Sequence, residues 1–174
     1  LPIGVGAPVP VQSMTNTPTT DVEATRQQLQ ALAAAGAALV RVSVPDRASA
    51  EALPAILDGT PVPLAADIHF QPELALLSLD AGIHKLRLNP GNIRRSRDVA
   101  RIAEKAGILG VPIRVGVNSG SVPGDIRERY GTGADALWAA AERHLDLLRK
   151  AGFHQVVVSI KASDPMLTVE ANLK

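Results

Sequence analysis

The sequence contains no cysteine. It can therefore form no disulfide, and it offers no thiolate ligand for zinc or for an iron–sulfur cluster. Any such chemistry has to come from outside these 174 residues. Hydrophobic residues nevertheless make up 46% of the chain, and its 14 glycines and 13 prolines are scattered, which is typical of a folded globular protein.

Aromatic residues are scarce, and neither sign of charge dominates. With two Phe, one Trp and one Tyr, the sequence has almost no side chains on which the bases of a single-stranded nucleic acid could stack. Lys and Arg number 18 and Asp and Glu number 17, and the net charge of +1 is too small to hold a nucleic acid or a membrane surface. We therefore expect neither partner, and any recognition by charge must be local.

Long hydrophobic runs are absent as well. No apolar stretch approaches the roughly 20 residues that a membrane-spanning helix requires. The opening residues, Leu1-Pro2-Ile3-Gly4, lack the basic region and the cleavage pattern of a secretory signal peptide. From these two absences we expect a cytoplasmic protein.

What the sequence does contain is a repeated alternation of strand-like and helix-like segments. Six short apolar runs have the composition of buried strands: Val9–Val11, Leu39–Val44, Val62–Ile68, Lys85–Leu88, Ile113–Val117 and Gln155–Ile160. Five segments between them carry apolar residues three and four apart, which predicts helices: Asp21–Ala35, Ala48–Leu57, Pro72–Ala81, Ser96–Ala106 and Ala134–Ala151. An Ala-Gly pair marks a predicted left-handed helix end at Gly36, Gly82, Gly107 and Gly152, and Thr20 with Glu23 matches a capping box.

Two architectures fit parallel strands that alternate with helices: an open doubly wound sheet and a closed (β/α)8 barrel. A dinucleotide-binding open sheet should have a glycine-rich turn after its first strand, but Gln12–Thr17 contains no glycine. Polar residues instead follow each strand, where barrel enzymes assemble their sites. We therefore predict an α/β fold, a (β/α)8 TIM barrel of which this chain covers about six βα units. Residues 1–174 would form one incomplete barrel domain.

Four cations recur near the carboxyl ends of four predicted strands: Arg41, Arg87, Arg114 and Lys161. Because strand residues two apart share a face, these side chains would converge inside a barrel. Clustered cations repel one another and lose hydration, so they need a polyanion or internal carboxylates to compensate them. Arginine binds phosphate oxygens bidentately, so the simplest ligand is a small di- or polyphosphate. The alternative is that each cation pairs with a carboxylate or extends to solvent.

Asp67 and His69 share the inward face of the third predicted strand. Together they could bind a metal, transfer a proton or orient substrate hydroxyls. Since no third ligand occurs at metal spacing, we predict hydrogen-bonding roles and no metal site in this chain. Asn118 has the inward parity of Arg114 and is a further candidate ligand. Other polar residues after the strands, several of which turn formation would explain equally well, are Gln12, Asn16, Asn89, Asn92 and Ser121.

Five segments carry a family resemblance: Val11–Thr17 (VQSMTNT), Ala66–Phe70 (ADIHF), Lys85–Asn92 (KLRLNPGN), Ile113–Asn118 (IRVGVN) and Ser159–Asp164 (SIKASD). Together they resemble the 4-hydroxy-3-methylbut-2-enyl diphosphate synthase family. The likeness runs from about Pro8 to Asn172, in order and at family-like spacing.

The resemblance implies a TIM-barrel domain that binds 2-C-methyl-D-erythritol 2,4-cyclodiphosphate, followed by a C-terminal domain, absent here, that carries a [4Fe-4S] cluster. It implies reductive ring opening and dehydration of this substrate to 4-hydroxy-3-methylbut-2-enyl diphosphate, in the methylerythritol phosphate route to isoprenoids. Flavodoxin or ferredoxin would supply the electrons to a homodimer. In the matching motifs, Arg41, Arg87, Arg114 and Lys161 correspond to diphosphate-binding cations, and Asp67, His69 and Asn118 to residues near the substrate's hydroxyl-bearing carbons.

The missing cysteines limit what this chain can do by itself. We expect it to bind no cluster and to be inactive alone, and we assign no catalytic residue to it. Two other functions remain open. One is a transferase barrel resembling dihydropteroate synthase, which also binds a diphosphate at strand ends, and the other is a non-catalytic phosphosugar-binding module.

Overall fold

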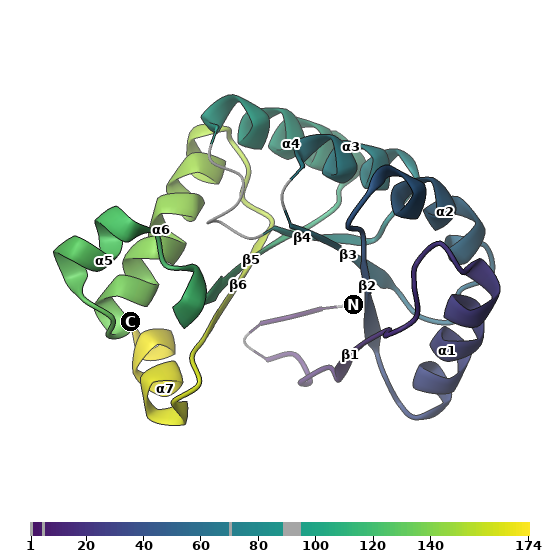
Figure 1. Ribbon diagram of the computed structural model, residues 1–174, viewed down its shortest axis with the longest axis horizontal. Helices are drawn as coiled ribbons and strands as arrows, with labels where there is room; N and C mark the ends of the chain where they lie inside the picture. Colours follow the sequence, from purple (N-terminus) through teal and green to yellow (C-terminus); the bar gives the residue numbers. More distant parts are fainter. Residues whose placement is uncertain (1, 5, 70, 89–94) are drawn as a thin grey trace.

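The computed structural model describes residues 2–4, 6–69, 71–88 and 95–174, and within them strands alternate with helices (Figure 1). The strands are β1 (Gln12–Met14), β2 (Leu39–Ser43), β3 (Leu64–Ile68), β4 (Lys85–Leu88), β5 (Ile113–Asn118) and β6 (Val156–Lys161). The helices are α1 (Val22–Ala34), α2 (Arg47–Leu57), α3 (Pro72–Asp80), α4 (Ser96–Leu109), the 3-10 helix η1 (Ser119–Ser121), α5 (Gly124–Tyr130), α6 (Ala134–Lys150) and α7 (Pro165–Leu173).

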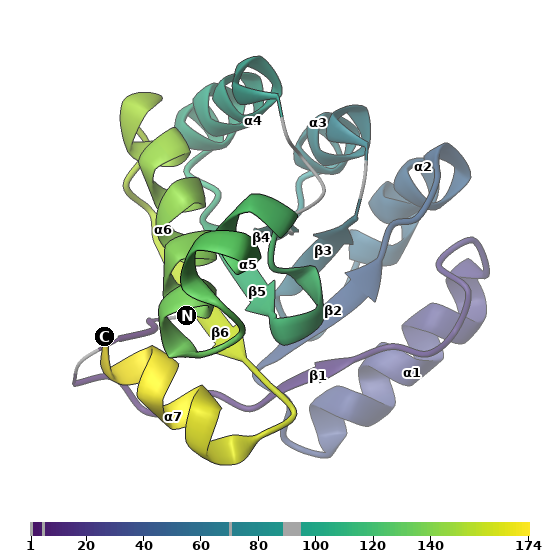
Figure 2. The same ribbon diagram turned by 60° about the vertical axis from the view of Figure 1, so that its left-hand side comes forward.

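All neighbouring strands are parallel, and their order in the sheet follows their order in the sequence from β1 to β6. The sheet is curled (Figure 1), and helices α1, α2, α3, α4 and α6 form an arc around its convex side (Figure 2). A curled parallel sheet with sequential strand order and helices outside is a partial (β/α)8 barrel. The predicted fold class is confirmed.

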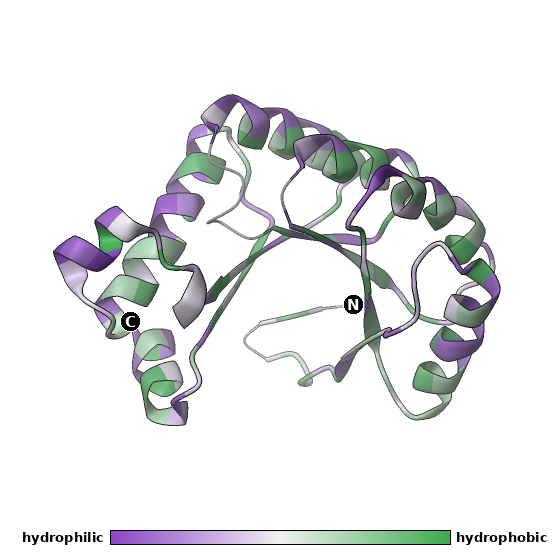
Figure 3. Ribbon diagram, in the orientation of Figure 1, coloured by the Kyte–Doolittle hydropathy of each residue, from purple (hydrophilic) through white to green (hydrophobic). Residues whose placement is uncertain are grey.

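The main hydrophobic core lies between the strands and the helices that cover them (Figure 3). Val40 and Val42 of β2 and Leu86 and Leu88 of β4 are buried in this core. Successive strand residues point to opposite faces, so the residues between them, such as Arg41, lie on the concave side. Burial of the aliphatic face therefore fixes which polar side chains face the interior of the barrel, because a slip of one residue would reverse both faces.

A smaller core joins α5, α6 and α7 to β5 and β6. It contains Ile126 of α5, Leu137 and Ala141 of α6, Ile160 of β6 and Ala171 of α7. Two of these helices, α5 and α7, were not expected from the sequence. None of the helices in the described ranges is both long and apolar enough to cross a bilayer.

The first strand lies later in the sequence than we predicted. It is Gln12–Met14 rather than Val9–Val11, and Val9 is 93% exposed. Pro10 has no backbone N–H to donate to a sheet ladder, which disfavours a strand centred on it. The segment therefore lacks the burial that its apolar side chains suggested.

Two predicted helix boundaries were also wrong. The N-cap of α1 is Asp21, whose carboxylate accepts the backbone N–H of Ala24, and not Thr20. Helix α4 continues through Gly107 and closes at Gly110, which has a left-handed φ of 67°. The longer helix also ends at a glycine, because a residue without Cβ adopts positive φ most easily.

Candidate functional site

The concave face of the sheet carries the charged side chains of the candidate site. Since β2 to β6 bury alternate residues against the helices, the intervening residues face the barrel interior. Residues of this parity, on the strands or directly after them, include all seven that the sequence singled out: Arg41, Asp67, His69, Arg87, Arg114, Asn118 and Lys161.

Asp67 lies at the centre of a charged cluster on β2, β3 and β4. The residue is only 2% exposed, and its Oδ1 accepts a 2.7 Å hydrogen bond from Nη1 of Arg87. Nε of Arg41 lies 3.3 Å from its Oδ2, and Nε2 of His69 lies 3.6 Å from its Oδ1. One carboxylate thus compensates two guanidinium groups. For Arg41 and Arg87 this agrees with the alternative interpretation, in which a cation pairs with a carboxylate.

Arg114 lies beside Arg87 in the register of β4 and β5. Its Nη2 donates to Oγ of Ser159 at 2.6 Å and its Nη1 donates to Oε1 of Gln12 at 3.2 Å. Because Gln12 is on β1, the second bond crosses the barrel interior and joins strands that are not neighbours in the sheet. Burial first, and then the guanidinium groups on β2 and β4, lower the pKa of Arg114, while the carboxylate on β3 partly opposes them.

Gly116 provides the space in which the Arg87 side chain lies. A Cβ on this residue would lie 3.0 Å from Nε and 3.3 Å from Nη2 of Arg87. Contacts between a carbon and a guanidinium group are normally longer, so any larger residue would displace the side chain that bonds to Asp67. Gly116 is a site residue that the sequence prediction missed, although a glycine inside a strand often signals such a close approach.

Asn118 and Lys161 are register partners at the carboxyl ends of β5 and β6. The backbone N–H of Asn118 donates to Oγ of Ser121, and the same hydroxyl donates to the carbonyl of Asn118, both at 3.0 Å. Ser121 thus has the turn-forming role that was one of its two interpretations. Lys161 is exposed. Asn89 and Asn92 lie outside the described residues.

Lys85 is a further buried cation of the barrel interior, and the sequence prediction omitted it. It is 5% exposed, and burial, followed by the charge of Arg114, lowers its pKa. Lys85 precedes Arg87 by two residues and therefore shares its face. This parity was available in the sequence, but the prediction considered only the carboxyl ends of the strands.

The inward face of the barrel carries more positive than negative charge. Among its described strand residues, Asp67 is the one carboxylate, and the cations are Arg41, Lys85, Arg87, Arg114 and Lys161. Such a surplus in a partly buried site favours a ligand with more than one negative charge. A cluster of iron and sulfur does not fit this chain, because the sequence has no cysteine and no three His, Asp or Glu side chains of the described residues are placed to hold a metal ion.

Comparison with known protein families shows to which family this chain belongs. The model of the GcpE TIM-barrel domain matches residues 1–174. The chain belongs to this GcpE family. It is 49% identical over 172 residues to the 4-hydroxy-3-methylbut-2-en-1-yl diphosphate synthase (flavodoxin) of Idiomarina loihiensis, covering 98% of this chain and 46% of that protein. The enzyme of the same name from Natranaerobius thermophilus is 48% identical over 171 residues, covering 98% of this chain and 48% of that protein. This chain thus spans about half the length of these relatives.

Solved structures support the barrel fold of this chain. The dihydropteroate synthase of Yersinia pestis superposes with a TM-score of 0.61 at 16% identity, covering 86% of this chain and 56% of that one. A putative phosphonomutase of Burkholderia cenocepacia superposes with a TM-score of 0.57 at 17% identity, covering 86% of this chain and 68% of that one. At these identities the likeness concerns the fold alone.

Proposed function

We propose that this chain is the substrate-binding barrel of a 4-hydroxy-3-methylbut-2-enyl diphosphate synthase. The full enzyme would open the ring of 2-C-methyl-D-erythritol 2,4-cyclodiphosphate reductively, with loss of water, in isoprenoid biosynthesis. The observation that carries the proposal is that Arg41, Arg87 and Arg114 lie together on the inward face of the barrel of a chain of this family, where a single buried carboxylate pairs with only two of them. Two linked phosphoryl groups supply the charge that this cluster lacks.

The cations would have different tasks in binding the diphosphate. Arg87 uses Nη1 to hold Asp67, and the guanidinium group has further N–H donors for a ligand. Arg114, which lacks a carboxylate partner among the described residues, and the exposed Lys161 are the groups whose charge is most available to phosphate. The fixed guanidinium groups would orient the diphosphate, and Lys161 would adapt to it.

The polar groups of the cluster would position the rest of the substrate. Asp67 is held by Arg41 and Arg87, so its carboxylate is fixed in orientation. His69 lies at the carboxyl end of β3 beside Asp67, and Asn118 lies across the site at the end of β5. We assign these three residues to the hydroxyl-bearing carbons of the substrate, where they can donate or accept hydrogen bonds.

The electron transfer of the reaction lies outside this chain. A [4Fe-4S] cluster would have to be held by a separate C-terminal domain, because the sequence has no cysteine and no residue set in the described part of the chain fits the cluster. The relatives are named as flavodoxin enzymes, so flavodoxin, or ferredoxin in its place, is the proposed donor. We further propose a cytoplasmic homodimer in which the cluster domain of one subunit covers the barrel of the other.

The test uses full-length protein with a reconstituted cluster and a strong chemical reductant. Addition of the cyclodiphosphate should release the linear diphosphate, detected by phosphorus NMR or mass spectrometry. Absence of product from intact, cluster-loaded protein would refute the assignment. A rise in melting temperature with a pterin diphosphate but not with the cyclodiphosphate would favour the transferase instead. Binding of phosphosugars without any turnover would favour the non-catalytic module.

A further inference from the structure

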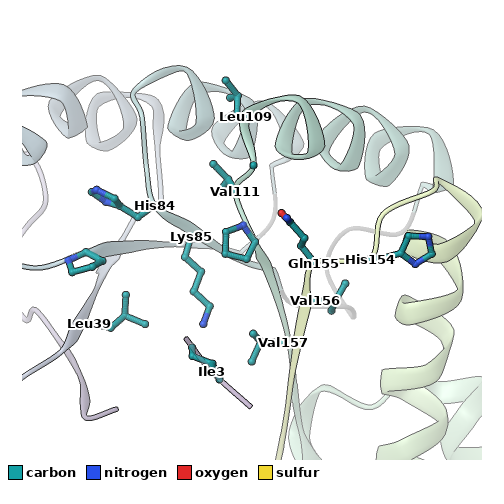
Figure 4. A pocket seen from close by; sticks show the side chains of 13 residues that line it. Ile3, Leu39, His84, Lys85, Leu109, Val111, His154, Gln155, Val156 and Val157 are labelled. Atoms are coloured by element: carbon teal, nitrogen blue, oxygen red, sulfur yellow. The ribbon is translucent and has the colours of Figure 1, made fainter. Parts of the chain in front are cut away.

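Met14 lies directly opposite Arg41 in the pairing of β1 with β2. The inward face of β2 also carries Leu39, whose side chain points into the barrel interior beside Lys85 (Figure 4). Arg41 follows Leu39 by two residues, so its side chain leaves β2 on the same face. Met14 therefore flanks Arg41 inside the barrel, and the contact joins two strands of this chain that pair directly.

The thioether of Met14 occupies one edge of the guanidinium group of Arg41. Nε of Arg41 donates to Sδ of Met14 at 3.3 Å, and Nη2 donates to the same sulfur at 3.0 Å. These two donors point to one side of the planar group and form a fork of the kind that binds carboxylate or phosphate bidentately. Sulfur is a weak, uncharged acceptor, so it fills the fork without neutralising the guanidinium group.

The carboxylate of Asp67 lies close to the same edge of Arg41. Its Oδ2 is 3.3 Å from Nε of Arg41, yet the hydrogen bonds of that edge go to the sulfur of Met14. Without the sulfur, a small rotation of the guanidinium group would let Nε and Nη2 form a bidentate pair with the carboxylate. Arg41 would then be neutralised within the chain, and its charge would be less available to a ligand.

The carboxyl end of β1 is anchored, which fixes the backbone from which the Met14 side chain extends. The backbone N–H of Thr15 donates to the carbonyl of Arg41 at 3.0 Å. The backbone N–H of Asn16 donates to Oε1 of Gln28 at 3.0 Å, and Oδ1 of Asn16 accepts from Nε2 of Gln28 at 2.6 Å. Because Gln28 belongs to α1, the helix holds the strand end that carries Met14.

We propose that Met14 is a positioning residue for Arg41. Its sulfur holds the edge formed by Nε and Nη2, so that Arg41 offers Nη1 and the second N–H of Nη2 to an anionic ligand. The inference rests on the proposed function in so far as this ligand is the diphosphate of the substrate. It adds a geometry to that function, since phosphoryl oxygens would meet Arg41 end-on and not in the fork beside Nε.

The first test is the affinity of full-length protein for inorganic pyrophosphate, measured by calorimetry at fixed ionic strength. Met14→Leu nearly conserves the volume of the side chain and removes its acceptor, and we expect affinity to fall roughly three- to tenfold. Met14→Gln places an amide oxygen near the position of the sulfur and should restore most of the affinity. Met166→Leu is the matched control, because Met166 is the other methionine of the chain and is exposed on α7; it should bind as the wild type does.

The second test separates positioning of Arg41 from a general structural role of Met14. If the sulfur acts through the guanidinium group, Met14→Leu should cause no further loss of affinity in an Arg41→Ala background. In turnover of the cyclodiphosphate by the cluster-loaded enzyme, the loss should appear in KM rather than in kcat, because the contact serves binding.

Wild-type pyrophosphate affinity in Met14→Leu would overturn the inference, and so would an equal loss with and without Arg41. Should Met14→Leu fail to fold, a crystal structure of the wild type with pyrophosphate decides. Phosphoryl oxygens on Nη1 with the sulfur still in the fork support the inference, and a phosphoryl oxygen between Nε and Nη2 refutes it. Absence of turnover by the wild type would refute the proposed function instead and would leave the pyrophosphate affinities to decide the role of Met14.

Discussion

Replacement of Gly116 by alanine tests whether the barrel interior is built around the Arg87 side chain. Gly116 has no positive φ, so its backbone can accept alanine without strain. In an open position, such a change stabilises a protein by about 0.4–1 kcal/mol, because the unfolded chain loses freedom. Here the added Cβ would lie 3.0 Å from Nε of Arg87. The sign of the change in the free energy of unfolding therefore shows whether the added Cβ meets the Arg87 side chain.

The expected magnitude follows from the distances around Arg87. An ordinary contact requires the guanidinium group to move by about 0.5 Å. If it moves away from Asp67, the 2.7 Å hydrogen bond between them lengthens toward the limit of a useful bond. Overpacking of this kind costs about 1–3 kcal/mol, and the gain of alanine over glycine offsets part of it. We expect a net loss of about 1–2 kcal/mol in the free energy of unfolding.

Urea denaturation of the full-length protein measures this loss, with Gly124→Ala as the matched control. Gly124 also lacks a positive φ, and a Cβ there meets nothing within 4 Å, so that variant should be as stable as the wild type or slightly more so. In an Arg87→Lys background the slimmer side chain should reduce the cost of Gly116→Ala, which a double-mutant cycle detects. A Gly116→Ala protein more stable than the wild type would refute the reasoning.

Three further predictions concern the charges of the barrel. Arg114→Ala or Lys161→Ala should each weaken diphosphate binding by about 1.5–3 kcal/mol in calorimetry, and unchanged affinity in both would exclude their phosphate role. Asp67→Asn leaves two guanidinium groups uncompensated and should lower the free energy of unfolding by about 3–5 kcal/mol in urea; wild-type stability would contradict the buried cluster. Burial lowers the pKa of His144 to about 4 from 6.5, so the unfolded state takes up its proton first and stability should fall by about 3 kcal/mol between pH 6.5 and pH 4. His144→Gln should remove this part of the pH dependence, and an identical pH profile in the variant would count against it.

The barrel could be predicted from the sequence because its two faces follow a simple alternation. Val40 and Val42 flank Arg41 on β2. The parallel sheet of the barrel buries the two valines against the helices and brings Arg41 together with other inward residues on its concave face. The first strand was misplaced because apolar composition alone does not report burial, as the exposure of Val9 shows. Helix α7 was overlooked, although Asp164 and Pro165 form a normal helix start, because its short apolar sequence has no clear period.

The site could be predicted only in part, because spacing along a strand does not give distances between strands. Inward parity correctly grouped Arg41, Arg87 and Arg114, but it could not tell that two of them share the carboxylate of Asp67. Which cation has a partner depends on the register of β2, β3 and β4, and register is a tertiary property.

Asp67, the one carboxylate among the described inward strand residues, explains how the barrel could both fold and accept the proposed anion. If every inward cation had a carboxylate partner, the interior would be neutral and a diphosphate would have to break ion pairs in order to bind. With no carboxylate at all, the guanidinium groups of β2, β4 and β5 would repel one another in a partly dry space. Asp67 compensates the two arginines nearest to it, and Arg114 keeps a lowered pKa and an Nε that has no hydrogen-bond partner among the described residues. The unfavourable energy of Arg114 is therefore one that the proposed phosphoryl ligand would relieve.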